Sequence, residues 1–84
     1  MRLYKEYIDL GFTRVESHDT VVYQNTGYGG FTLVKQIAPF MEIAISHDEL
    51  DRPKLYIYKK GSKDNCHIIA LTPEQVIDIF YLQK

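Results

Sequence analysis

The 84-residue chain has no tryptophan, one cysteine and three prolines. No apolar run approaches the ~20 residues that a membrane-spanning helix needs, so we expect no such helix. The lone Cys66 cannot form an intramolecular disulfide, and the first residues contain no apolar stretch typical of a secretory signal. We therefore expect a reducing, cytoplasmic setting.

An excess of one charge sign is also missing, because ten basic and eleven acidic residues leave a net charge of −1. This balance argues against wholesale binding of nucleic acid by a basic surface and against an acidic chain that imitates DNA. Locally the charge is uneven, since five basic residues fall within residues 52–63, which contain no acid, just after Asp48, Glu49 and Asp51. With 45% hydrophobic and 25% charged residues, the chain is expected to form one globular domain over residues 1–84.

Apolar residues at helical spacing predict a helix at each end of the chain. At the start, Leu3, Tyr7 and Leu10 recur at i, i+4 and i+7, and Gly11 follows where a helix can end in a left-handed residue. At the end, residues 72–75 combine a capping threonine, a proline suited to the first helical position and a glutamine that completes a capping box. The stripe expected to pack onto a sheet consists of Val76, Ile79 and Phe80.

Between these helices the pattern is typical of strands. In residues 12–17 side chains of different character alternate with a period of two, and the polar pair His18-Asp19 separates this segment from residues 20–23, which predicts a hairpin of two strands. Residues 25–30, with three glycines, are predicted to form a loop. Residues 31–47 are strand-like except at Pro39, which marks a turn between two strands, a bulge or an edge position. Further strands are predicted at residues 54–60 and 66–71.

The predicted fold class is α+β. An antiparallel meander of about five strands carries a short N-terminal helix and a C-terminal helix, both packed on one face. Because 84 residues are too few to cover both faces, the opposite face of the sheet is expected to meet water or a partner.

Catalytic motifs are missing from the sequence: it has no phosphate-binding loop, nucleophile elbow, zinc-protease motif or dinucleotide fingerprint. The glycine cluster at residues 27–30 does not open a helix, so it lacks the anion-binding geometry of a helix N-terminus. Cys66 and His67 are adjacent, and neighbouring side chains of a strand point to opposite faces. We therefore expect a protein that is not an enzyme.

The imidazoles and the thiol could bind zinc, because tetrahedral zinc takes such ligands and each of them lies near a predicted turn or strand end. No chelating spacing supports this. If residues 31–47 form two strands, His18 is expected to share an end of the sheet with Cys66 and His67; if they form one, it shares an end with His47. The alternative is that these are surface histidines and a half-buried cysteine. The candidate ligands for Zn²⁺, the one cofactor considered, are His18, His47, Cys66 and His67.

The strand predicted at residues 54–60 carries different side chains on its two faces. If Leu55 and Ile57 face the helices, two tyrosines flanked by lysines stand on the open face, and a further tyrosine lies in the glycine loop. Such residues suit a protein interface, could also stack bases and neutralise phosphates, or could simply be cross-strand neighbours on a wet face. The candidate partner-binding residues are Lys54, Tyr56, Tyr58, Lys60 and Tyr28.

The two ends of the chain together resemble a known class of small proteins. Residues 4–12 (YKEYIDLGF) are a short helix ending in Leu-Gly-aromatic, and residues 69–80 (IALTPEQVIDIF) are a strand running into a Leu-Thr-Pro-Glu helix. This layout resembles small orphan proteins of phages and prophages of Gram-positive bacteria, among them anti-CRISPR proteins that occupy a surface of a type II CRISPR nuclease. The resemblance implies a non-enzymatic, phage-borne inhibitor that binds a host protein. The alternatives are a small zinc-binding protein and a nucleic-acid-binding accessory protein.

Overall fold

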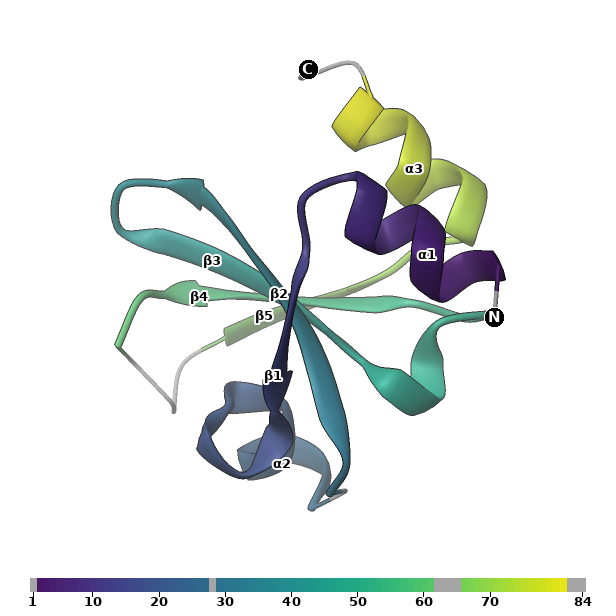
Figure 1. Ribbon diagram of the computed structural model, residues 1–84. Helices are drawn as coiled ribbons and strands as arrows, with labels where there is room; N and C mark the ends of the chain where they lie inside the picture. The colour runs from purple at the N-terminus through teal and green to yellow at the C-terminus, as the bar shows by residue number, and fades with distance from the viewer. Residues whose placement is uncertain (1, 28, 62–65, 82–84) are drawn as a thin grey trace.

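A computed structural model describes residues 2–27, 29–61 and 66–81 and confirms the α+β class (Figure 1). A five-stranded antiparallel sheet has the strand order β1-β2-β3-β4-β5, so that strands adjacent in the sequence are also neighbours in the sheet. The strands are β1 (Thr13–Glu16), β2 (Phe31–Ala38), β3 (Met41–Ser46), β4 (Lys54–Lys59) and β5 (Cys66–Ala70). The helices are α1 (Arg2–Asp9), α2 (Val21–Thr26) and α3 (Pro73–Tyr81), with short 3-10 turns η1 (Ser17–Asp19) and η2 (His47–Glu49).

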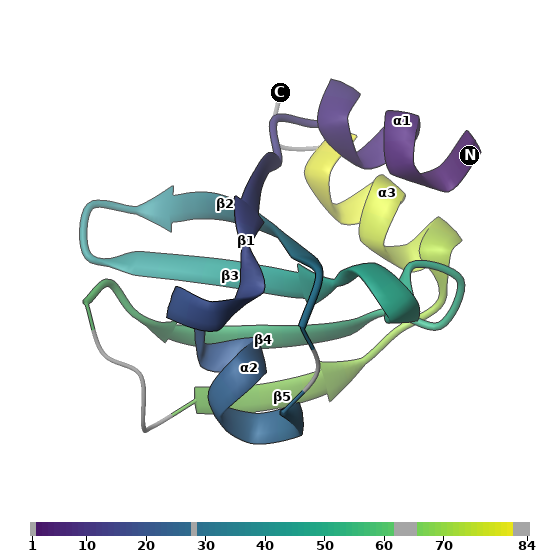
Figure 2. The ribbon, with the colours of Figure 1, turned by 60° about the horizontal axis from the view of Figure 1, so that its bottom comes forward.

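The two terminal helices lie side by side on one face of the sheet, as predicted (Figures 1 and 2). They bury aromatic and aliphatic side chains against the sheet, including Tyr7, Phe12, Leu33, Ile43, Ile45, Leu55, Val76 and Phe80. The predicted capping box of α3 is present: the Gln75 amide donates to the Thr72 hydroxyl at 3.1 Å, and the Thr72 amide donates to the Gln75 side chain at 2.9 Å.

The strand predicted at residues 20–23 is wrong, because this segment belongs to the helix α2. Thr20 caps that helix by accepting a hydrogen bond from the Tyr23 amide at 3.4 Å, and Gly27 ends it in a left-handed conformation with φ +72°. The predicted hairpin is therefore absent, and β1 pairs with β2 instead.

Residues 31–47 form two strands. The turn between β2 and β3 contains Pro39, and Ala38 pairs with Met41 across it. The register shifts between Gln36 and Ala38, so the proline sits at the end of a hairpin where no ladder hydrogen bond is required of it. Of the three alternatives for Pro39, the turn joining two strands is confirmed.

A second core covers the middle of the opposite face of the sheet, for which the sequence predicts an open surface. Val21 and Val22 of α2 pack there against Ala44 of β3 and the tyrosines of β4. Thr32 and Ser17 lie buried beside them and share a 2.7 Å hydrogen bond between their hydroxyls. The expectation of an open second face is therefore wrong for the part over β3 and β4, which the short helix α2 covers, whereas Ile68 of β5 on the same face is exposed.

None of the described helices is long and apolar enough to cross a membrane.

Candidate protein-binding surface

The two central residues of the predicted binding face are buried under α2. Tyr56 is 3% exposed and Tyr58 is 7% exposed, so the prediction that they stand on an open face is wrong. The Tyr56 hydroxyl donates to Glu49 at 3.5 Å, and burial together with the nearby Glu49 raises the pKa of Tyr56 to about 12. Burial, with Glu42 close by, likewise raises the pKa of Tyr58 above its ordinary value. These rings are core residues with polar tips.

The two lysines of that predicted face lie at opposite ends of β4. Lys54 is exposed and pairs with Glu49 at 3.6 Å at one end of β4. Lys60 is exposed beyond the other end, where its amide donates to the Phe40 carbonyl at 2.8 Å. Tyr28 lies outside the described residues.

The predicted zinc ligands are divided between the two ends of the sheet. His18 packs against the Tyr23 ring, with ring centroids 4.9 Å apart, and His47 packs on Phe31 at 5.2 Å. Both histidines follow strand ends on one side of the sheet, and they flank Gly29 and Gly30.

Cys66 and His67 begin β5 at the opposite end, and their side chains lie on different faces because Cys66 pairs with Tyr58 and His67 with Ile57. Cys66 accepts a hydrogen bond from the Asn25 side chain at 3.5 Å. The prediction that two strands in residues 31–47 would place His18 with Cys66 is wrong, because the absence of a strand at 20–23 reverses the strand directions that follow. Across the described part of the chain, no three His, Cys, Asp or Glu side chains gather in a metal-binding group.

An apolar hollow opens where α3 meets the sheet. Its volume is about 340 Å³, and it lies on the same sheet face as the two terminal helices, which leave part of that face uncovered (Figure 2). We call this hollow the apolar groove. Its lining consists of Ile37, Ile43, Leu55, Ile57, Ile69, Leu71, Ile79 and Phe80.

Exposed apolar side chains continue from the groove toward the β2–β3 turn. Ile37 and Met41 are exposed, and Phe40, which follows Pro39 in the turn, is 72% exposed. A second hollow of about 430 Å³ is lined by Phe40, Met41 and Lys59. The apolar groove therefore extends, at Ile37, toward a turn that carries further accessible apolar side chains.

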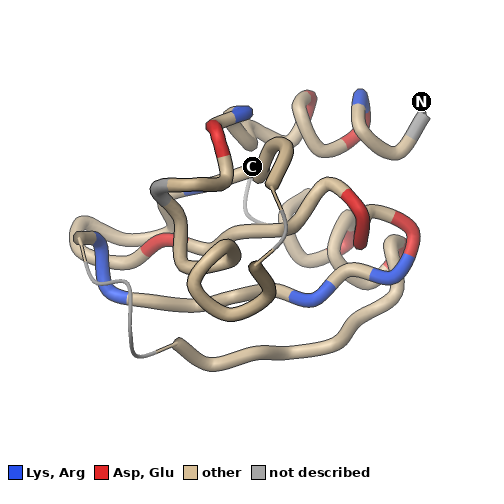
Figure 3. Tube along the Cα trace, turned by 90° about the horizontal axis from the view of Figure 1, so that it is seen from below, with Lys and Arg blue, Asp and Glu red and all other residues tan. Residues whose placement is uncertain are grey.

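Positive charge accompanies the apolar groove. Lys59, at the end of β4 next to the β2–β3 turn, lines the second hollow. Figure 3 shows basic segments at that end of the sheet, beside an acidic one, and also at the opposite end. On the α1 side, the Lys35 ammonium donates to the Leu10 carbonyl at 2.8 Å and lies 5.8 Å from the centre of the Phe80 ring. Among the described residues, no carboxylate lines either hollow.

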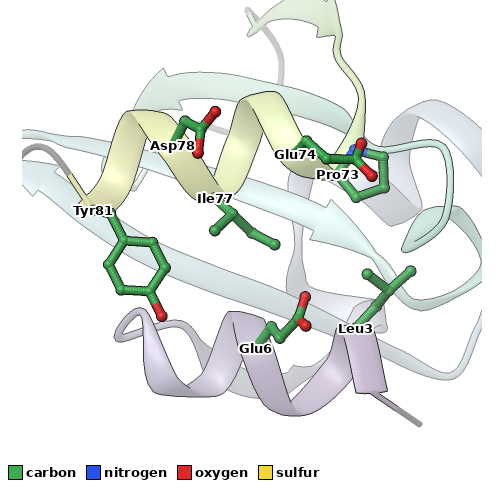
Figure 4. A pocket seen from close by; sticks show the side chains of 7 residues that line it. All are labelled: Leu3, Glu6, Pro73, Glu74, Ile77, Asp78 and Tyr81. Atoms are coloured by element: carbon green, nitrogen blue, oxygen red, sulfur yellow. The ribbon is translucent and has the colours of Figure 1, made fainter.

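A third hollow, between α1 and α3, has the opposite charge. It measures about 430 Å³ and combines an apolar floor with carboxylates from both helices (Figure 4). Ile77 and Tyr81 project from α3 toward α1, and Glu6 of α1 points back into the space between the helices (Figure 4). Glu74 and Asp78 complete its acidic lining. A basic segment would suit this hollow, whereas an acidic one suits the groove.

Comparison with protein-family models, with curated proteins and with solved structures gives no match to this chain. Sequence patterning missed the apolar groove, although period-two alternation placed Leu55 and Ile57 on the correct face. The signal that could have found it is the repeated occurrence of isoleucine in the strands that line this face, at Ile37, Ile43, Ile57 and Ile69.

Proposed function

We propose that this protein is a non-enzymatic protein-binding module and that its binding site is the apolar groove with the adjoining β2–β3 turn. One observation carries the proposal: a groove with only apolar lining reaches Ile37 of β2, and Phe40, in the turn that follows this strand, is 72% exposed. Monomeric proteins rarely expose a large contiguous apolar patch unless it binds something. Aromatic and aliphatic anchors of this kind supply most of the binding energy at protein interfaces.

The charge around the groove indicates the chemistry of the partner. Lys59 lines the second hollow, next to the β2–β3 turn. Among the described residues, no acidic side chain lines this hollow or the apolar groove. A segment with an apolar anchor and acidic neighbours would fill the groove and pair with Lys59, because complementary charge favours correct docking. The resemblance to phage inhibitors adds a class of partner to test first, a host protein such as a type II CRISPR nuclease.

Selection of random peptides on the immobilised protein tests this proposal for a partner segment of any sequence. We expect the enriched peptides to combine large apolar residues with Asp or Glu. Ile37→Glu and Ile79→Glu should each weaken binding of such a peptide at least ~10-fold, because each places a charge in the groove at a cost of about 1.4 kcal/mol or more. Both side chains are partly exposed, so the fold should tolerate the changes.

Two variants serve as matched controls. Ile68→Glu changes an exposed isoleucine on the opposite face and should leave the peptide affinity unchanged. Glu74→Gln changes the acidic hollow and should also have no effect. Enrichment of basic peptides whose binding Glu74→Gln weakens would contradict the proposal and favour the hollow between α1 and α3, and a selection without enrichment would contradict it as well.

The class of partner needs a separate measurement. Purified type II CRISPR nuclease should bind the wild-type protein and lose affinity for the Ile37→Glu variant. If Ile37→Glu leaves the affinity for the nuclease unchanged, the nuclease binds at a site other than the apolar groove. If the wild-type protein does not bind the nuclease, this class of partner is rejected.

A further inference from the structure

The outer strand β5 is an unprotected edge of the sheet. It is last in the strand order and pairs with β4 along its length. Both of its isoleucines are exposed, Ile68 by 50% and Ile69 by 43%, and they lie on opposite faces. Its sequence, Cys-His-Ile-Ile-Ala, contains no Asp, Glu, Lys, Arg or Pro. Proteins usually protect an edge with such residues, because an apolar edge strand invites pairing with another chain.

The opposite edge of the sheet differs in this respect. Strand β1 has four residues, and two of them, Arg14 and Glu16, are exposed and charged. A short and charged edge resists pairing. The contrast between the two edges marks β5 as the one suited to an additional strand.

The hydrogen-bond pattern shows which backbone groups of β5 face outward. The Leu71 amide donates to the Pro53 carbonyl at 3.0 Å, so this pair is of the hydrogen-bonded type. Such pairs alternate along an antiparallel ladder, so Ile69 and His67 also direct their backbone groups toward β4. Consequently, the N–H and C=O groups of Cys66, Ile68 and Ala70 point away from the sheet.

We propose that two copies of this chain associate by antiparallel pairing of their β5 strands about a two-fold axis at Ile68. Ile68 then lies opposite the partner's Ile68, and Cys66 lies opposite the partner's Ala70. Because the three outward-facing residues are spaced symmetrically about Ile68, each of their N–H groups meets a carbonyl of the other copy. An isologous contact of this kind closes as a dimer and leaves no further β5 edge exposed.

The side chains fit this register. No ionised carboxylate or ammonium group on either β5 faces a like charge, since the strand carries none. The two copies of Ile68 meet on the α2 face, and His67 lies beside the partner's Ile69 on the groove face. The two-fold axis runs through the sheet, so both apolar grooves open on the same side of one continuous sheet.

The expected association is weak. Pairing of five-residue strands buries less than the roughly 1,200 Å² at which stable interfaces begin. Sedimentation velocity of the full chain should therefore show a monomer of 9.8 kDa near ~10 µM and a rising share of species of twice that mass toward ~1 mM.

Opposite charges at the two-fold axis test the register directly. Ile68→Lys and Ile68→Glu should each be monomeric at all concentrations, because each places two like charges opposite each other. An equimolar mixture of the two variants should recover the dimer, since a lysine then faces a glutamate. This recovery also shows that both variants are folded.

The control is Phe40→Lys, which removes an exposed aromatic side chain from the β2–β3 turn, separated from β5 by β4, and should leave dimerisation unchanged. A wild-type chain that stays monomeric to ~1 mM would overturn the proposal, as would a mixture that fails to associate or a dimer lost in Phe40→Lys. Ile68→Lys should still bind a groove peptide, so failure of the dimer and failure of the proposed binding function are distinguishable.

Discussion

At the scale of single residues, the face of β4 that Tyr56 and Tyr58 occupy and the burial of their side chains depend on different parts of the sequence. Period-two alternation places Tyr56 and Tyr58 on the face opposite Leu55, and the structure confirms that assignment. Their exposure depends on residues 21–26, far away in the sequence, and the pattern of β4 contains no information about them. The face of a side chain could thus be predicted from local sequence, but its burial could not.

Removal of the two rings should therefore destabilise the fold. We expect Tyr56→Ala and Tyr58→Ala each to cost about 3–5 kcal/mol, as for other buried aromatic side chains. The double variant should lose cooperative unfolding in urea. Phe40→Ala, at an exposed aromatic position, should change stability by less than about 0.5 kcal/mol. A double variant that unfolds cooperatively near the wild-type midpoint would show that these rings lie outside the core.

Alkaline pH should also weaken the fold through its buried tyrosines. Burial raises the pKa of Tyr7 and Tyr56 from 10.0 to about 12, each with a smaller contribution from nearby carboxylates. Above pH 10 the unfolded chain releases these protons while the folded chain retains them, so the free energy of unfolding falls as pH rises from 10 to 12. Below pH 10 these groups contribute no pH dependence.

Urea unfolding across pH 8–12 measures this effect. In Tyr56→Phe, which cannot ionise at that position, the fall above pH 10 should be smaller than in the wild type. A free energy of unfolding that is constant up to pH 12, or a fall of the same size in Tyr56→Phe, would contradict the assignment.

At the scale of elements, the sequence predicted both terminal helices and the strands β4 and β5, and it left residues 31–47 open between one strand and two. These elements have long periodic patterns or clear capping residues. The failure at Val21–Thr26 has a physical cause: Val-Val-Tyr favours a strand locally, but the segment gains more from burying both valines against Ala44 and Tyr56. Polar side chains support the helix, since Asn25 and Thr26 each donate to a helix carbonyl at 2.8 Å.

The incorrect strand at residues 20–23 also changes the predicted zinc site and the predicted binding face. An additional strand reverses the direction of every strand after it, which puts His47 at the wrong end of the sheet relative to His18. The same error leaves the tyrosine face open in the prediction. No local pattern could have corrected either, because both depend on which elements contact each other in three dimensions.

The cap of α3 should be a measurable contribution to stability. Thr72→Ala removes the side-chain acceptor of the Gln75 amide, and we expect a loss of about 1 kcal/mol in the free energy of unfolding. Thr72→Ser keeps a hydroxyl and should retain most of the stability. Equal urea midpoints for the alanine variant and the wild type would show that the helix does not depend on this cap.

At the scale of the whole molecule, three short helices do not cover a five-stranded sheet completely. The terminal helices leave part of their own face uncovered, and the apolar groove runs there from Leu71 and Ile79, beside α3, to Ile37 near the β2–β3 turn (Figure 2). The groove and the exposed Ile68 and Ile69 of β5 are both apolar surface that the short helices leave uncovered. We infer that a binding partner and a second copy complete the burial that the single chain leaves unfinished.

The most direct test of the binding function follows the isoleucine methyl groups by NMR while a selected apolar and acidic peptide is added. Isoleucines lie throughout the molecule and report on separate surfaces. Signals of Ile37, Ile57, Ile69 and Ile79 should shift with saturation, because these residues line the apolar groove. Signals of Ile77, in the acidic hollow, and Ile68, on the opposite face, should stay constant. Shifts confined to Ile77 or Ile68, with the groove signals unchanged, would contradict the account.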